Sequence, residues 1–186
     1  MSRVVLDLGH HGLTGGRPGA EHGDRREVAI VRRYTIAAAD HLEAAGVAVD
    51  FAGQGRYSTR QAQAARDKAA AYVACHVNAR WRNGYGASVY HSKDGASGGL
   101  LAYHLASHLR RALGQCRTWG TSPDDWTKHA HSLVWRAQSE GVPAVVYEPA
   151  FIDGPAEQLA LLDDPARLGG CLAAGILDYL EAARDA

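Results

Sequence analysis

Apolar and polar positions follow one another along the chain in blocks that predict strands alternating with helices. Residues 4–8 are almost continuously apolar, as in a strand that is buried on both faces of a sheet. Similar short apolar runs at 47–52, 71–77 and 142–147 predict three more strands. A weaker alternation at 87–91 indicates a fifth strand, at the edge of the sheet.

A long helix is predicted between the first two strands, over residues 25–45. Val31, Tyr34 and Leu42 belong to an apolar stripe that recurs at steps of three and four residues, and Gly46 is a typical signal for the helix end. Further helices are expected at 58–70, 100–113, 131–139 and from 165 to near the C-terminus, whereas 9–23 and 115–127 are expected to be irregular.

The last predicted helix has a clear start, with Asp164 as the N-cap and Pro165 at the first helical position. Strands that alternate with helices indicate an α/β sheet with helices on both faces. The sequence contains no linker, low-complexity segment or internal repeat, so we expect a single domain.

Composition narrows the class of protein. The 186 residues are 46% hydrophobic and 22% charged, which is typical of a folded domain. Lys+Arg and Asp+Glu are 20 each, so the net charge of zero gives no basic surface for nucleic acid. No apolar run reaches the ~18 residues that a membrane-spanning helix needs. The three cysteines, Cys75, Cys116 and Cys171, lack C-x-x-C spacing, and we expect reduced, structural thiols.

Ionisable residues stand where three of the predicted strands end. His10 follows the first strand, His76 ends the third and Glu148 ends the last. Ligands of open α/β sheets bind at the carboxyl ends of the strands. The three residues therefore predict a functional site at that edge of the sheet.

Glu27 lies on the apolar stripe of the first helix, four residues before Val31. A carboxylate that faces inward needs a partner, and a metal ion is one such partner. The alternative is a capping box, because Asp24-x-x-Glu27 has its form. Both interpretations remain open at this point.

Two histidines and one carboxylate, with one open position, form a recurring catalytic zinc set. His10, Glu27 and His76 would supply it, and Glu148 could accept a proton from a zinc-activated water.

Four motifs in order resemble one family, the zinc-dependent N-acetylmuramoyl-L-alanine amidases (Amidase_3). Residues 6–12, Leu-Asp-Leu-Gly-His-His-Gly, are similar to its opening Asp-Pro-Gly-His-Gly-Gly. Gly19-Ala20 resembles the Gly-Ala before the family's metal-binding Glu, and Glu27 keeps its interval to Gly46. Residues 75–79 resemble its Ser-(Ile)-His-x-Asn-Ala, and residues 143–152 its Pro-Ala-x-Leu-x-Glu-x-Gly-Phe.

The resemblance implies that His10, Glu27 and His76 bind one zinc ion per chain and that Glu148 is the general base. It implies hydrolysis of the amide bond between N-acetylmuramic acid and L-alanine in peptidoglycan. It also implies a twisted, mostly parallel sheet. We therefore expect a single three-layer α/β domain over residues 1–186, with no separate cell-wall-binding domain. Peptidoglycan is the expected partner of a monomer that binds no nucleic acid and does not insert into membranes.

Departures from the family pattern leave alternatives. Leu8, His11 and Ala150 replace the usual Pro, Gly and Gly. His11 could compete with His10 for the metal, although neighbouring residues in an extended chain point to opposite sides, and we expect His10 to bind. Another zinc peptidase or amidohydrolase on the same fold, and a peptidoglycan-binding protein that no longer cleaves, are the rival interpretations.

Some residues have both a plain and a functional interpretation. His129 and His131, and His104 and His108, are two histidine pairs for which exposure or packing is favoured over a place in the site. Arg60 could pair with a structural acid, which is favoured, or with a substrate carboxylate. Trp119 and Trp126 could stack on sugar rings or pack in the ordinary way, and both interpretations are equally open.

The biological setting is the least specific expectation. The apolar segment at the start of the chain, residues 4–6, ends at Asp7 and is too short for the apolar region of a signal peptide. We expect synthesis in the cytoplasm and action on the cell wall after release or non-classical export, as in a phage or prophage endolysin. A host wall-remodelling enzyme is the alternative.

Overall fold

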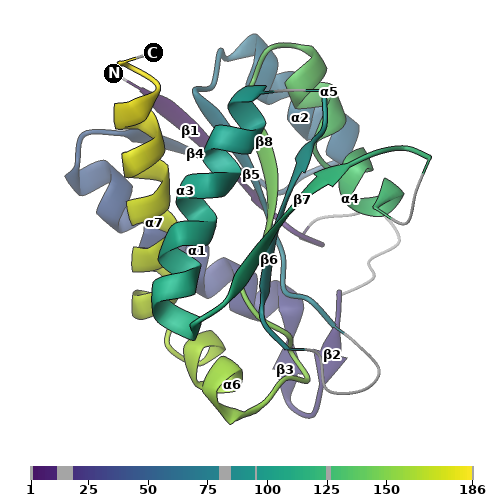
Figure 1. Cartoon of the computed structure of the whole chain (residues 1–186), viewed down its shortest axis with the longest axis vertical. Coiled ribbons are helices and arrows are strands. Elements are labelled where there is room, and N and C mark those ends of the chain that lie inside the picture. The colour runs from purple at the N-terminus through teal and green to yellow at the C-terminus, as the bar shows by residue number, and fades with distance from the viewer. Residues whose placement is uncertain (1, 12–18, 80–84, 95, 125–126, 186) are drawn as a thin grey trace.

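A computed structural model describes residues 2–11, 19–79, 85–94, 96–124 and 127–185. Its centre is a six-stranded sheet in the order β4-β1-β5-β8-β6-β7 (Figure 1). The first four strands of this order run parallel, β6 is antiparallel to β8, and β7 is parallel to β6. The strands are β1 (Arg3–Leu8), β4 (Ala48–Ala52), β5 (Ala71–Cys75), β6 (Ala87–Ser92), β7 (Cys116–Thr121) and β8 (Ala144–Glu148).

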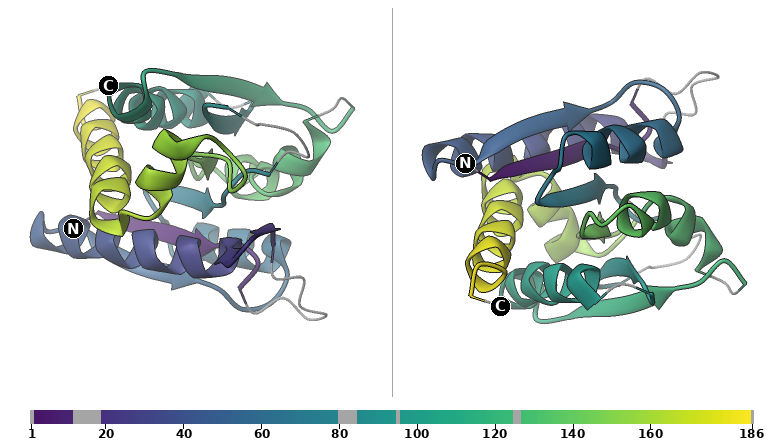
Figure 2. Two further views of the ribbon diagram at one scale, coloured as in Figure 1. Left: turned by 90° about the horizontal axis from the view of Figure 1, so that it is seen from below. Right: turned by 90° about the horizontal axis from the view of Figure 1, so that it is seen from above.

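Helices cover both faces of the sheet, which confirms the expected α/β architecture. On one face, α1 (Glu27–Ala44), α3 (Ala96–Leu113) and α7 (Pro165–Ala182) enclose the larger core, and α7 packs between α1 and α3 (Figure 2). On the other face, α2 (Tyr57–Arg66), α4 (Lys128–Ser132) and α5 (Trp135–Ser139) cover the smaller core. No helix among the described residues is long and apolar enough to cross a membrane.

The central strands are apolar on both faces because both faces are covered. In β1, Val4 and Leu6 belong to the larger core and Val5 to the smaller one, and all residues of β5 are buried. This two-sided burial explains why the sequence shows continuous apolar runs at these strands.

The expected strand at 87–91 exists, but its predicted place at the edge of the sheet is wrong. β6 lies between β8 and β7, and the strand at this edge of the sheet is β7, in a segment that was expected to be irregular. β7 packs mainly against one helix, α3, and less against α4, and its Arg117 and Thr118 are exposed. Half-covered edge strands carry a weak hydrophobic signal, which Gly120 weakens further.

The helix limits differ from the expectations at several places. The first helix begins at Glu27 because residues 25–26 form β3 (Arg25–Arg26), which pairs with β2 (Glu21–His22) in a small hairpin. The helix expected at 131–139 is two short helices, and α6 (Ala156–Leu162) was not predicted. The start of α7 is confirmed: the Asp164 side chain accepts a hydrogen bond from the backbone N–H of Arg167, and Pro165 is the first helical residue.

Candidate metal centre and active site

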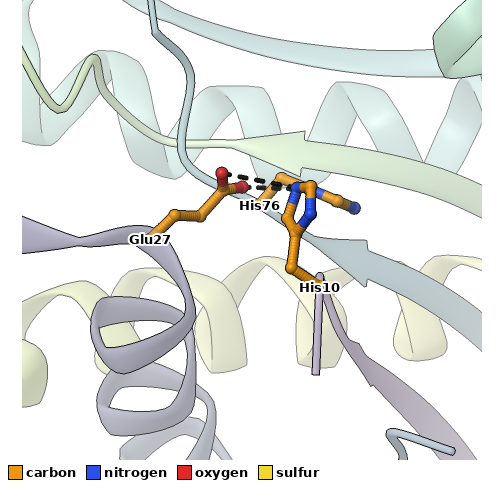
Figure 3. A group of neighbouring side chains, drawn as sticks. All are labelled: His10, Glu27 and His76. Atoms are coloured by element: carbon orange, nitrogen blue, oxygen red, sulfur yellow. Dashed lines mark hydrogen bonds and ion pairs between the residues drawn. The ribbon is translucent and has the colours of Figure 1, made fainter. Parts of the chain in front are cut away.

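Three side chains from separate elements meet at the carboxyl ends of the central strands. His10 follows β1, Glu27 begins α1 and His76 follows β5 (Figure 3). One potential ligand atom from each lies within 4.8 Å of the others. His76 Nδ1 is 3.1 Å from Glu27 Oε1, and His10 Nε2 is 3.4 Å from Glu27 Oε2. This group of one carboxylate and two imidazoles could hold a metal ion.

The capping-box interpretation of Glu27 is wrong. The N-cap position is Arg26, so Glu27 is the first residue of the helix and Asp24 lies in the hairpin before it. The Glu27 side chain is 3% exposed, and its carboxylate accepts hydrogen bonds from the backbone N–H groups of Ala20 (2.7 Å) and Val77 (2.9 Å). Burial alone would raise the pKa of Glu27, but the hydrogen bond and charge of His76 outweigh it and lower this pKa.

His76 is a buried imidazole with one nitrogen satisfied and one not. Nδ1 contacts Glu27, whereas Nε2 has no hydrogen-bond partner among the described residues. A buried polar atom without a partner is costly, so such atoms in native proteins commonly mark a place for a ligand, ion or water.

Two glycines leave room for these side chains. A Cβ on Gly9 would lie 2.3 Å from the carbonyl oxygen of Cys75 and 2.8 Å from the His76 ring. Gly19 has φ +80°, and a Cβ there would lie 2.5 Å from Glu27 Oε2. Only glycine fits either position without displacing the site.

His10, and not His11, faces the group. The backbone of His10 adopts φ 62°, a conformation that is costly for a residue with a side chain and that clusters at functional sites. The ring of His11 lies elsewhere, with Nδ1 3.2 Å from the carbonyl oxygen of Gly53.

A buried polar network supports the loop that carries His10. Asp7 is fully buried and pairs with Arg60 Nη1 at 2.6 Å, while the Tyr72 hydroxyl donates to its other oxygen. Arg60 Nη2 donates to the carbonyl oxygen of His11 at 2.5 Å, and the guanidinium lies over the ring of Tyr57. The favoured interpretation of Arg60 as a partner of a structural acid is confirmed. The role of Asp7 was missed, and an acid inside an otherwise apolar strand was the available signal.

Glu148 ends β8 and lines the same cavity as the three side chains. The cavity has a volume of about 410 Å³. Burial raises the pKa of Glu148 to about 7, although the charge of His76 and a hydrogen bond with Asn78 oppose this shift. A carboxyl with this pKa can both accept and release a proton near neutral pH. Other residues that line the cavity are Tyr57, Asn78, Tyr90, His129 and Leu133.

The structure separates the other histidines that the sequence singled out. His129 lines the cavity from α4, but His131 does not: its Nδ1 lies 3.2 Å from Thr121 Oγ1 and its ring stacks on Trp135. His104 and His108 do not act as a pair, because His108 contacts Asp178 at 2.8 Å and His104 packs edge-on against Tyr103.

The remaining predicted residues lie apart from this group. Trp119 lines a second hollow, and Trp126 lies outside the described residues. Cys75, Cys116 and Cys171 are free thiols. Burial raises the pKa of Cys75, which is completely buried directly before His76.

Comparison with known proteins places this geometry in context. Residues 4–178 match the family described as N-acetylmuramoyl-L-alanine amidase. No curated protein matches the sequence significantly.

Solved structures share the fold at low sequence identity. The N-acetylmuramoyl-L-alanine amidase AmiC2 of Nostoc punctiforme is 21% identical with a TM-score of 0.78, and the match covers 97% of each chain. The CwlD amidase of Clostridioides difficile, solved in complex with the GerS lipoprotein, is 20% identical with a TM-score of 0.78, over 98% of this chain and 100% of that one. The catalytic domain of the CD27L endolysin, which targets Clostridia difficile, is 17% identical with a TM-score of 0.74, over 96% and 98%.

Proposed function

Because the chain belongs to the N-acetylmuramoyl-L-alanine amidase family, we propose that it hydrolyses peptidoglycan with zinc held by His10, Glu27 and His76 and with Glu148 as general base. The bond cleaved is the amide between the lactyl group of N-acetylmuramic acid and L-alanine. The observation that carries this proposal is the convergence of the His–Glu–His group and Glu148 on one cavity.

The residues fit a zinc ion. Tetrahedral zinc with nitrogen and oxygen ligands at 2.0–2.1 Å sets neighbouring ligand atoms about 3.3 Å apart. The separations of 3.1 Å between Glu27 Oε1 and His76 Nδ1 and of 3.4 Å between Glu27 Oε2 and His10 Nε2 are close to that spacing, and imidazole nitrogen and carboxylate oxygen are donors that zinc accepts. When bound, zinc supplies Lewis acidity, which polarises a carbonyl and lowers the pKa of a water molecule.

Glu148 handles the proton in this mechanism. Its carboxylate accepts a proton from the attacking water and later delivers that proton to the amine of L-alanine as the amide bond breaks. In the metal-free chain burial raises the pKa of this carboxyl, which makes it a better proton acceptor than an exposed glutamate, and the hydrogen bond with Asn78 holds it beside the cavity. The buried contacts of Glu27 with two backbone N–H groups keep the carboxylate oriented toward both imidazoles.

The direct test is the release of stem peptides with new L-alanine amino termini from purified peptidoglycan. We expect release by the wild type, loss of release with a chelator and recovery when zinc is restored. Glu148→Gln should keep zinc and lose at least about 100-fold in turnover. Glu43→Gln, at an exposed position in α1, is the matched control.

The outcomes separate the rival functions. Turnover of E148Q near the wild-type rate would remove Glu148 from the mechanism. Zinc binding without release of L-alanine termini would support a non-catalytic peptidoglycan-binding protein. Zinc-dependent cleavage at another peptide bond would support a different peptidase on this fold.

We also propose that the activity is lytic or wall-remodelling. The likeness in fold to an endolysin catalytic domain supports the lytic setting. Addition of the purified protein to cell walls and to permeabilised cells, with turbidity as the readout, tests it; clearance only of isolated wall fragments would favour remodelling.

A further inference from the structure

The face of the sheet that carries Glu148 continues across two more strands. Ser88 of β6 is the register partner of Glu148 on one side and of Arg117 of β7 on the other. Directly opposed residues in neighbouring strands project from the same face of a sheet. Glu148, Ser88 and Arg117 therefore form one row that leads from the catalytic cavity to the edge of the sheet.

A second hollow lies over this row. It has a volume of about 670 Å³ and is lined by Ser88, Arg117 and Trp119, among others. Asn78 and Tyr90 line both this hollow and the catalytic cavity, so the two adjoin. A substrate held at Glu148 can extend into the second hollow without leaving the protein surface.

Arg117 gives this hollow its chemical character. It is the one charged side chain among the described residues that line the hollow, and no carboxylate in the described part of the chain forms an ion pair with it. Its guanidinium lies over the Trp119 ring, 5.9 Å from the ring centroid. A guanidinium in such a cation–π contact keeps its N–H groups for a planar anion such as a carboxylate. Because its positive charge lies over this ring, the arrangement favours an anionic ligand over a stacked sugar.

The distance from Glu148 to Arg117 indicates which residue of the stem peptide can reach Arg117. Two strand spacings of about 4.8 Å set Arg117 roughly 10 Å from Glu148 along the sheet. An extended peptide covers about 3.3–3.6 Å per residue, so this distance corresponds to the second or third residue beyond the scissile bond. We propose that Arg117 is a specificity-determining residue that binds a free carboxylate on the second or third residue of the stem peptide. This inference rests on the proposed amidase function.

Binding to an inactive variant tests the inference apart from turnover. The ligands are muramoyl tripeptides whose stem carboxyl groups are either all free or all amidated, and the protein is zinc-loaded E148Q. We expect about fivefold tighter binding of the free acid by calorimetry, the gain of an exposed ion pair. Adding Arg117→Ala should abolish this preference and leave the affinity for the amide unchanged. Adding Arg111→Ala, at an exposed arginine in the last turn of α3, should keep the preference.

Two further variants at position 117 distinguish a loss of the carboxylate preference from a loss of folding in Arg117→Ala. Arg117→Lys keeps the charge and should retain part of the preference, while Arg117→Gln should lose it. Equal affinities for both ligands in E148Q, or a preference that survives Arg117→Ala, would overturn the inference. With Glu148 intact, failure to release L-alanine termini from peptidoglycan would instead overturn the amidase function, whereas equal cleavage of free and amidated substrates would overturn only the role of Arg117.

Discussion

The backbone N–H of His10 donates a hydrogen bond to the phenolic oxygen of Tyr57 at 3.0 Å. This bond connects the candidate metal group to α2 across 47 residues of sequence. Tyr57 in turn lies beneath the guanidinium of Arg60, which is paired with Asp7. The strained backbone of His10 is therefore fixed by contacts that lie outside the group itself.

Tyr57→Phe removes this bond and leaves the ring in place. We expect zinc affinity to fall about tenfold, because partners that orient a metal-binding histidine commonly contribute 10- to 100-fold. Competition with a chromophoric chelator measures the affinity. Tyr103→Phe, at an exposed tyrosine, is the control. Unchanged affinity in Y57F would mean that the His10 backbone needs no such support.

Gly9→Ala should damage the site through crowding. Its Cβ would overlap the Cys75 carbonyl and the His76 ring, so we expect about 1–3 kcal/mol of lost stability and weaker zinc binding. Denaturant unfolding of the metal-free protein measures the first effect. Gly170→Ala in α7, where a Cβ meets only the far end of His41 at 3.7 Å, should be neutral or slightly stabilising.

The buried Asp7–Arg60 pair should show strong coupling in unfolding experiments. Arg60→Met alone leaves the Asp7 carboxylate buried without its cation, and we expect a loss of about 3–5 kcal/mol. Asp7→Asn combined with Arg60→Met should cost about 2 kcal/mol less than the sum of the single changes. Additive effects in this double-mutant cycle would show that the two side chains do not depend on each other.

Glu148 should make the stability of the metal-free protein depend on pH. Its pKa is raised from 4.5 to about 7, so the folded chain holds this proton more tightly than the unfolded chain does. The stabilising contribution is complete below pH ~4.5 and is lost as the pH rises through about 7, to a total of at most about 3 kcal/mol. Thermal unfolding from pH 4 to 8 should therefore show E148Q gaining stability relative to the wild type as the pH rises. The exposed control E43Q should differ from the wild type in stability by the same amount at every pH. The same pH-independent difference for E148Q would contradict the raised pKa of Glu148.

The sequence predicted which side chains come together where each one ends an apolar strand and the sheet brings those strand ends together. His10, His76 and Glu148 each end an apolar run, and parallel pairing of β1, β5 and β8 brings such ends to one edge of the sheet. Glu27 was ambiguous because it lies four residues before Val31, on the stripe of the helix, and also three residues after Asp24, as in a capping box. The hairpin of residues 21–26 excludes the capping box, because it moves the start of the helix to Glu27. The hydrophobic pattern of the sequence does not predict this hairpin.

Other features depend on partners that are distant in sequence. Asp7 finds its cation 53 residues away, so its burial cannot be read from its neighbours. β7 is paired on one side only, and its open face, with Arg117, looks like a loop in sequence.

The burial of Cys75 has a consequence for the redox tolerance of the protein. A thiolate beside His76 would be a strong zinc ligand and a target for oxidants, but burial keeps this thiol protonated and enclosed. Burial also raises the pKa of Cys116 to about 12 and raises that of Cys171. All three cysteines are free, so the fold requires no oxidising compartment to form a disulfide, and the two buried thiols, Cys75 and Cys116, need no reducing one for protection. The thiol next to His76 can therefore stay intact both in the reducing interior of a cell and in the oxidising surroundings of its wall, whereas the partly buried Cys171 is open to oxidants.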